Sequence, residues 1–405
     1  MPSNKGLIPS KEYDIKDSNV ELIGTDIDHK VKYNSALTEP AWNDGCVGVT
    51  TGLKVWRIEN FEVVPLPPHQ IGVFFEGDSY IVLHSYKVGN EDGTETHRLG
   101  HDAFFWLGSK TSQDEAGVAA YKTVELDEFL QGTATQHRET QAEPSDVFLA
   151  LFPRITIRRG GVASGFRHVE ETVKPETKTL LRVFSAGHMV GRDSVVVHEV
   201  EPSATSLDEG DVFIFDRGDK IYVWQGKNCS PMEKAKAAQI VHDMTLAKHV
   251  DVEVLSQLDS GSRRVLEELG AGDESEVQSF HHARPLGSTS RGPASGPMKS
   301  SQPSKLLRLS DASGQLQFEL IKDGYISKND LDGNDVFILN NANREIWVWE
   351  GARASSAERA SWLKVAQAYV RHLQSEDEAS RAYQIPIAKV KQGFESPAFL
   401  HTIRA

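Results

Sequence analysis

The chain has 405 residues, of which 39% are hydrophobic and 25% are charged, which is an ordinary globular balance. Its length predicts several domains, because a single core seldom grows beyond about 250–300 residues. The net charge of −14 argues against nucleic acid as the main ligand, since phosphate binding needs a basic surface. Two cysteines, Cys46 and Cys229, are too few for a disulfide scaffold.

No apolar run approaches the roughly 20 residues that a membrane-spanning helix needs, and the polar N-terminus lacks the apolar core of a secretory signal. We therefore expect a cytoplasmic protein without a membrane span. Residues 1–45 are polar and lack the pattern that follows, so we expect them to form an N-terminal extension.

One pattern then occurs three times. Its copies read GDSYIVL with FFWLG, GDVFIFD with KIYVWQG, and NDVFILN with EIWVWEG, and they start at residues 77, 210 and 334. Aromatic and β-branched runs of this kind predict two buried strands joined by a turn. A helix is expected after each final Gly, and in the second copy Pro231 occupies a position that a first helical turn tolerates. Apolar residues at helical spacing follow in the second and third copies.

The spacing of the copies is that of whole domains. Strand, strand, long helix, further strand and a short final element predict an α+β fold with a sheet between helices. Residues 271–304 are rich in Gly, Ser and Pro, as is typical of a linker. We therefore divide the remaining chain into a first domain (46–160), a second domain with its leading segment (161–270), the linker (271–304) and a third domain (305–405).

Each copy places an Asp at a strand start and a Glu early in the next helix: Asp78 with Glu115, Asp211 with Glu233, and Asp335 with Glu358. Two converging carboxylates repel each other, and a hard cation such as calcium, which accepts six to eight oxygens, relieves that repulsion. One copy alone would be explained by a turn Asp and a first-turn helix Glu. Three copies at matching offsets favour calcium.

The helix expected in the first domain carries a second apolar stripe. Val118, Tyr121 and Val124, beside Glu125 and Glu128, lie opposite the face that carries Ala116, Ala119 and Leu126. Such a stripe suits docking into the groove of a partner protein, or it is covered by another layer of the same chain, such as residues 1–45. The spacing does not decide between these two interpretations.

A basic segment ends the first domain and begins the next, with Arg154, Arg158, Arg159, Arg167 and His168. It suits an acidic protein surface or anionic lipid headgroups, and the alternative is a solvated linker. Motifs of catalysis such as GxSxG, GxxxxGK[ST] and HExxH do not occur, so we do not expect an enzyme.

Longer motifs in the first domain resemble a known family. SQDEAG (112–117), TATQHRE (133–139) and GGVASGF (160–166), together with the repeated strands, are similar to the gelsolin family and in particular to its three-domain, severin/fragmin-like members. The resemblance implies three gelsolin-like domains, each with a central mixed sheet sandwiched between a long and a short helix. It implies a monomer that severs actin filaments and caps their barbed ends under calcium control. The alternative function is capping or monomer binding without severing.

The resemblance also implies which residues bind ligands. The first-domain calcium ion would be held by Gly77, Asp78, Glu115 and Val162, and a second ion, shared with an actin carboxylate, by Asp127, Gly132 and Ala134. The second domain would use Gly210, Asp211 and Glu233 with Asp273, and the third Asn334, Asp335 and Glu358 with Glu395. Val118, Tyr121, Val124, Glu125 and Glu128 would contact actin, and the basic segment would bind the filament side or phosphoinositide lipids.

One stretch departs from the pattern of the family. Residues 184–200 (FSAGHMVGRDSVVVHEV) replace a strongly basic cluster that many members carry early in the second domain. Because severing needs the second domain to bind the filament side, this departure keeps the alternative function open.

Overall fold

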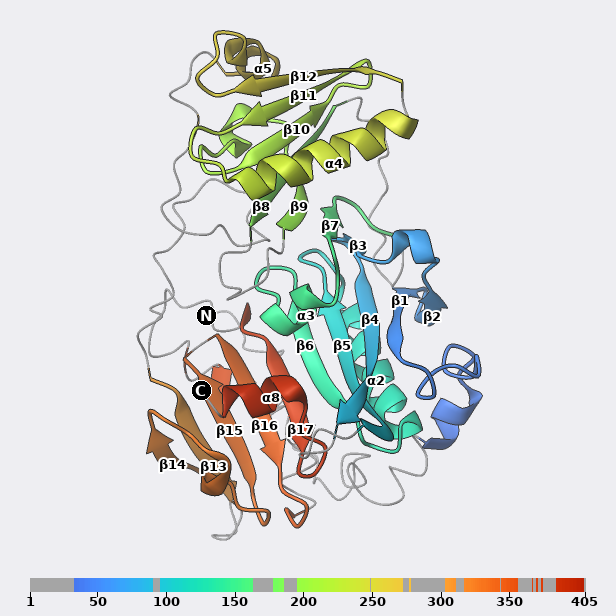
Figure 1. Ribbon diagram of the computed structural model, residues 1–405. Helices are drawn as coiled ribbons and strands as arrows, with labels where there is room; N and C mark the ends of the chain where they lie inside the picture. The colour runs from blue at the N-terminus through green and yellow to red at the C-terminus, as the bar shows by residue number, and fades with distance from the viewer. Residues whose placement is uncertain are drawn as a thin grey trace, which may run out of the picture.

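The computed structural model of the chain is shown in Figure 1. It describes residues 33–89, 95–162, 178–185, 195–247, 249–271, 277, 303–310, 317–342, 344–355, 366, 369–370, 373 and 384–403. Within this part of the chain, no helix is both long enough and apolar enough to cross a membrane.

The first domain is built on an antiparallel hairpin that is extended on both sides. Strand β4 pairs antiparallel with β5 and with β1, whereas β6 pairs parallel with β5, which makes the sheet mixed. The elements are β1 (Gly52–Glu59), β2 (Glu62–Pro65), η3 (Pro68–Gln70), β3 (Val73–Phe75), β4 (Ser79–Gly89), β5 (Glu95–Leu107), α2 (Gln113–Phe129), β6 (Thr135–Thr140), α3 (Asp146–Ala150) and β7 (Ile155–Arg158).

The second and third domains repeat this arrangement. Each again has an antiparallel hairpin followed by a parallel strand, β10–β11 with β12 and β15–β16 with β17. The second domain comprises β8 (Thr179–Ser185), β9 (Val195–Val200), η4 (Ala204–Ser206), β10 (Val212–Asp216), β11 (Lys220–Gln225), α4 (Pro231–Ala247), β12 (Asp251–Ser256) and α5 (Ser262–Glu268). The third comprises β13 (Lys305–Ser310), β14 (Gln317–Asp323), η6 (Lys328–Asp330), β15 (Val336–Asn341), β16 (Glu345–Glu350), β17 (Ile387–Lys391) and α8 (Pro397–Thr402).

The predicted α+β class and the three repeated hairpins are confirmed. Helix α2 begins with a capping box between Ser112 and Glu115, and α4 begins at Pro231 as expected. In the first two domains a long helix covers one face of the sheet and a short helix covers the other, so each sheet has an apolar core on both faces. In the third domain α8 covers one face, and Ala366, Tyr369 and Val370 are buried against the other.

The domains do not keep separate sheets. Strand β17 of the third domain pairs with β6 of the first at three positions, Ile387 with Arg138, Ala388 with His137, and Lys389 with Gln136. The result is one ten-stranded sheet in the order β14-β13-β15-β16-β17-β6-β5-β4-β1-β2, visible in Figure 1 as β17 lying beside β6. This pairing satisfies the free N–H and C=O groups that each strand would otherwise expose at a sheet edge.

The first and second domains are joined in a similar way. Strand β7 pairs parallel with β9 of the second domain and with β3, which gives a seven-stranded sheet in the order β12-β11-β10-β8-β9-β7-β3. Phe184 of β8 and Val196 of β9 pack into the same apolar cluster as Phe74 and Phe152 of the first domain. Both junctions therefore combine backbone pairing with side-chain contact.

Candidate cation and partner-binding sites

The first-domain site forms where the start of β4 meets residues 160–162. Asp78 is fully buried, and its Oδ1 accepts a hydrogen bond from Val162 N at 2.8 Å. Its Oδ2 accepts from the Tyr80 hydroxyl at 3.2 Å and lies 3.6 Å from Arg57 Nη1. Burial raises the pKa of Asp78 to about 6, although the Val162 N–H and the Arg57 charge oppose that rise.

Glu115 brings the second carboxylate of this site, in the first turn of α2. Its Oε2 accepts hydrogen bonds from Ser112 N and Thr111 Oγ1, whereas its buried Oε1 has no partner among the described residues. Burial and, to a smaller extent, the Asp78 carboxylate raise the pKa of Glu115. Two buried carboxylates that repel each other, one with an unused oxygen, are a donor set that fits a hard cation.

The backbone around this pair is also shaped for close approach. Gly77 N donates to Gly160 O at 2.8 Å, which brings residues 160–162 against the strand start. A Cβ on Gly161 would collide with Asp78 Oδ1, so only glycine fits there. Within the described residues, no three His, Cys, Asp or Glu side chains converge as in a metal centre. Backbone oxygens, such as those predicted for Gly77 and Val162, would have to complete the coordination.

The second-domain pair has the same placement. Asp211 and Glu233 are buried, and Glu233 accepts hydrogen bonds from Ser185 N at 2.7 Å and Ser230 N at 2.8 Å. Burial raises the pKa of Asp211 to about 6; Arg182 lowers it, and the Asp208 and Glu233 carboxylates raise it. The Gly210 amide donates to Asp208 Oδ1, and Asp273 lies outside the described residues.

The third-domain site is described in part. Asp335 Oδ2 lies 3.6 Å from Arg308 Nη1, and the Asn334 amide groups donate to Asp332 Oδ1. Glu358 lies outside the described residues. Glu395 accepts hydrogen bonds from Trp349 Nε1 at 3.2 Å and Gly393 N at 2.9 Å.

Sequence reasoning missed one member of all three sites, an arginine on the neighbouring strand. We call Arg57, Arg182 and Arg308 the site arginines. Each stands opposite the aromatic residue that follows the site Asp by two positions: Arg57 pairs with Tyr80, Arg182 with Phe213, and Arg308 with Phe337. The signal in the sequence is an arginine within an apolar run ahead of each copy, in the fragments KVWRI, LLRVF and LLRLS. These fragments lie at unequal distances from the site aspartates, which concealed the repeat.

The residues predicted for the second ion of the first domain lie together in the turn between α2 and β6. Ala134 N donates to Asp127 Oδ1 at 2.9 Å, Gln136 Nε2 to Asp127 Oδ2 at 2.6 Å, and Gly132 N to Asp127 O at 2.7 Å. Lys391 of the third domain reaches this turn, since a Cβ built on Gly132 would lie 2.7 Å from its Nζ. An ammonium group therefore lies beside the place predicted for the ion.

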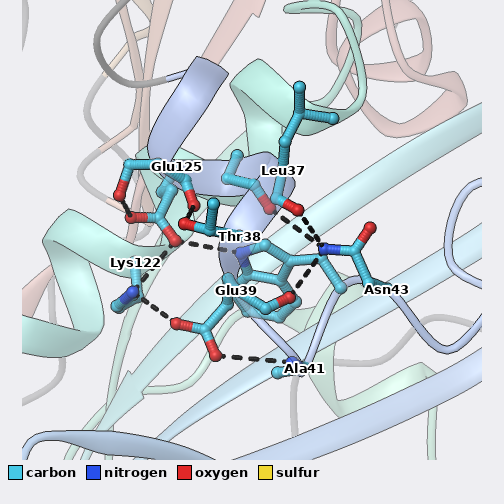
Figure 2. Close-up of polar contacts among 10 residues, drawn as sticks. Leu37, Thr38, Glu39, Ala41, Asn43, Lys122 and Glu125 are labelled. Carbon is cyan, nitrogen blue, oxygen red and sulfur yellow. Dashed lines mark hydrogen bonds and ion pairs between the residues drawn. The ribbon is translucent and has the colours of Figure 1, made fainter.

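The predicted partner-binding stripe of α2 is divided by the N-terminal segment. Figure 2 shows Glu125 beside the segment that carries Thr38 and Glu39 and close to Lys122, and the Glu125 side chain is buried. It accepts hydrogen bonds from Ser35 Oγ at 2.9 Å and Trp42 Nε1 at 3.2 Å, and it pairs with Lys122 at 2.9 Å. Lys122 also pairs with Glu39. We call residues 33–50 the N-terminal brace.

The prediction that Glu125 faces a partner must therefore be corrected, because only 1% of it is exposed under the brace. Tyr121, in contrast, is 48% exposed, as an outward stripe requires. Val118, Val124 and Glu128 are half-buried, and Val118 packs against the edge of the core. Another layer of the same chain thus covers part of the predicted stripe, whereas Tyr121 remains accessible and its contact with a partner stays a prediction.

The basic segment faces acidic groups of the second domain. Arg158 Nε lies 2.5 Å from Glu199 Oε2, and Arg154 Nη1 lies 3.6 Å from Asp243 Oδ2. The Arg159 amide also points to Glu199 Oε2, at 3.5 Å. Arg167 and His168 lie outside the described residues.

Comparison with known proteins agrees with this architecture. A sequence model described as the Gelsolin repeat matches residues 60–149 and 193–263. Gelsolin-like protein 1 of Lumbricus terrestris is 38% identical, over 95% of this chain and 99% of that protein. Severin of Echinococcus granulosus is 33% identical over 90% of this chain and 92% of its own length. "Actin depolymerising venom protein gelsolin 1" of Platymeris rhadamanthus is 36% identical over 80% of this chain and 82% of its own. With relatives this similar along nearly its whole length, the chain belongs to the gelsolin family.

Proposed function

We propose that the chain is a monomeric, cytoplasmic actin-binding protein that severs actin filaments and caps their barbed ends under calcium control. The observation that carries the proposal is the buried Asp78–Glu115 pair, which has an unused oxygen, in a chain of this family. The name of the Platymeris relative, which specifies actin depolymerisation, supports the choice of partner.

Calcium would supply positive charge beyond that of the single arginine that lies beside each site Asp. In the first domain, Asp78 and Glu115 would hold it together with the carbonyl groups of Gly77 and Val162. Asp78 is fixed to Val162 N and Glu115 to the N-cap of α2, so the site would link the sheet to the helix and to residues 160–162. The other sites would comprise Gly210, Asp211, Glu233 and Asp273 in the second domain, and Asn334, Asp335, Glu358 and Glu395 in the third.

In this arrangement of the domains, the third domain covers the first-domain turn that would share an ion with actin. Lys391 lies beside Gly132, where an ion shared with an actin carboxylate would involve Asp127, Gly132 and Ala134. Arg98 of the first domain donates to Gly393 O at 3.1 Å and stacks on the Phe394 ring at 4.7 Å. Actin could use this turn only after the third domain has moved away.

The junction that would have to open combines strand pairing with a few side-chain contacts, among them Thr140 Oγ1 donating to Gln384 O at 3.0 Å. Strands β6 and β17 pair at three positions, and the buried Glu345 Oε1 beside them has no hydrogen-bond partner among the described residues. His137 Nδ1 also has none there, whereas His137 Nε2 lies 3.6 Å from Asp102 Oδ1. A buried polar group without a partner costs about 1–3 kcal/mol. We infer that this junction opens before actin binds.

Capping or monomer binding without severing is the second candidate. It is favoured by the lack of a basic cluster at 184–200 and by the pairing of Arg154 and Arg158 with Asp243 and Glu199. In this arrangement a filament side or a phosphoinositide headgroup would compete with these carboxylates for the two arginines.

Dilution of pre-formed actin filaments distinguishes the two functions. Severing multiplies filament ends and speeds depolymerisation, whereas capping slows the loss of subunits from existing ends. We expect accelerated depolymerisation in calcium and none in a chelator. Tyr121→Asp is the matched control: it should weaken both activities and leave the melting temperature unchanged, because Tyr121 is half-exposed. Slowed depolymerisation by the wild type in calcium would establish the second candidate instead.

A further inference from the structure

The three site arginines repeat one arrangement, in which an arginine on the neighbouring strand lies beside the site Asp. Each reaches the carboxylate of the site Asp from the neighbouring strand, at the same register with respect to the hairpin. The separations are 3.6 Å for Arg57 to Asp78, 2.5 Å for Arg182 to Asp211 and 3.6 Å for Arg308 to Asp335. In each domain a cation of the chain itself therefore faces a carboxylate that is predicted to bind calcium.

The three pairs differ in how the arginine is held. Arg57 is bonded to Glu59 through both Nε and Nη2, and Arg308 Nη2 lies 2.5 Å from Glu319 Oε2. Each of these two arginines thus has a second carboxylate partner besides the site Asp. In addition, the side chains of Arg57 and Arg308 are 18% and 37% exposed, so water screens them.

Arg182 lacks both features. Its side chain is 4% exposed and stacks on the Phe184 ring, with its guanidinium carbon 3.9 Å from the ring centre. Among the described residues, Asp211 is the carboxylate that pairs with it. A calcium ion bound to Asp211 would take all or part of the negative charge that neutralises the Arg182 guanidinium. A buried guanidinium without a full counter-ion is strongly unfavourable.

We propose that the site arginines are counter-ions that compete with calcium for the site aspartates. Because Arg182 is buried and, unlike Arg57 and Arg308, pairs with no second carboxylate among the described residues, the second-domain site should bind calcium most weakly of the three. The inference rests on the proposed calcium sites and adds the order in which they fill. Where Glu59 or Glu319 can hold the arginine, release of the site Asp is easy. In the second domain, the competing charge remains in place.

Calcium titration of the full chain by calorimetry, with calcium chloride as the probe, tests this order. Arg182→Gln should raise the affinity of the weakest site about tenfold or more, since an opposite charge at this range commonly shifts carboxylate equilibria by one to three decades. Arg57→Gln and Arg308→Gln should change the affinities of their own sites by less than about threefold. Asp211→Ala, by removing the weakest binding event, identifies the site.

A second readout covers a variant that folds poorly. Without calcium, Arg182→Gln leaves Asp211 buried and unpaired, so the variant should melt below the wild type in a chelator. In calcium much of that loss should be recovered, which widens the gap between the two melting temperatures. Arg182→Lys keeps the charge and should retain the affinity of the wild type to within about threefold.

The possible failures are distinguishable. If the wild type binds no calcium, the calcium part of the proposed function is wrong and this inference is wrong with it. If the wild type binds calcium but Arg182→Gln binds no more tightly, only the counter-ion inference is overturned. Equal gains from all three glutamine variants would refute the predicted order while retaining the competition.

Discussion

Replacing Glu125 with alanine removes an acceptor that three donors share. Trp42 Nε1, Ser35 Oγ and Lys122 Nζ all bond to this carboxylate, which fastens the N-terminal brace to α2 (Figure 2). Trp42 is fully buried, so its indole N–H would remain unpaired, at a cost of about 1–3 kcal/mol. Lys122 keeps Glu39, and Ser35 can turn to water, so these two add little. We expect a loss of about 2 kcal/mol in the free energy of unfolding.

Thermal melting of the full chain in a chelator measures this loss, which should lower the transition of the first domain by roughly 5–10 °C. Glu125→Gln keeps a carbonyl acceptor for Trp42 and should lose about half as much. Tyr121→Ala, four residues earlier and half-exposed, is the matched control and should melt like the wild type. If Glu125→Ala melts like the wild type but no longer binds actin, the brace does not cover Glu125 and the original outward assignment was right.

Three further changes test other contacts. Asp211→Ala should lower the free energy of unfolding by about 3–5 kcal/mol even in a chelator, because it leaves the buried Arg182 charge without its partner. Unchanged melting in the chelator would show that the pair does not form. Arg158→Glu should lose about 1 kcal/mol in denaturant unfolding by opposing Glu199, and adding Glu199→Arg should restore stability; absence of rescue would contradict the contact. Burial raises the pKa of Glu345 from 4.5 to about 7, so its contribution to stability is complete below about pH 4.5 and is lost as the pH rises through 7. Glu345→Gln should therefore stabilise the chain more at pH 8 than at pH 5, and equal gains at both would refute the assignment.

The hairpins and the helix starts could be predicted because their signals are local. Aromatic and β-branched runs ending in Gly specify strands wherever they occur, and Pro231 marks a helix start without reference to the rest of the fold. The convergence of Asp78 with Glu115 follows from the same local geometry, since the Asp begins a strand and the Glu lies in the first turn of the next helix. Predictions of this kind need no knowledge of which domains touch.

The features that could not be predicted depend on contacts between distant segments. Helical spacing places Glu125 opposite the core of α2, but it carries no information about a brace that returns over the helix. Trp42 was the available signal, since a tryptophan in a polar extension needs an apolar surface to cover it. The pairing of β6 with β17 was equally hidden, because any free strand edge can accept another and the sequence does not say which edges meet.

The placement of the two predicted first-domain ions relative to these junctions suggests how binding would be communicated. Residues 160–162 directly follow β7, the strand that pairs with β9 of the second domain, and Glu76 N bonds to Arg158 O at 3.0 Å. The Asp127–Ala134 turn directly precedes β6, the strand that pairs with β17 of the third domain. Each ion would thus bind at the end of a strand that joins two domains. Because close-packed strands transmit small displacements instead of absorbing them, an ion that draws either segment towards its carboxylates would act on the neighbouring domain through that one strand.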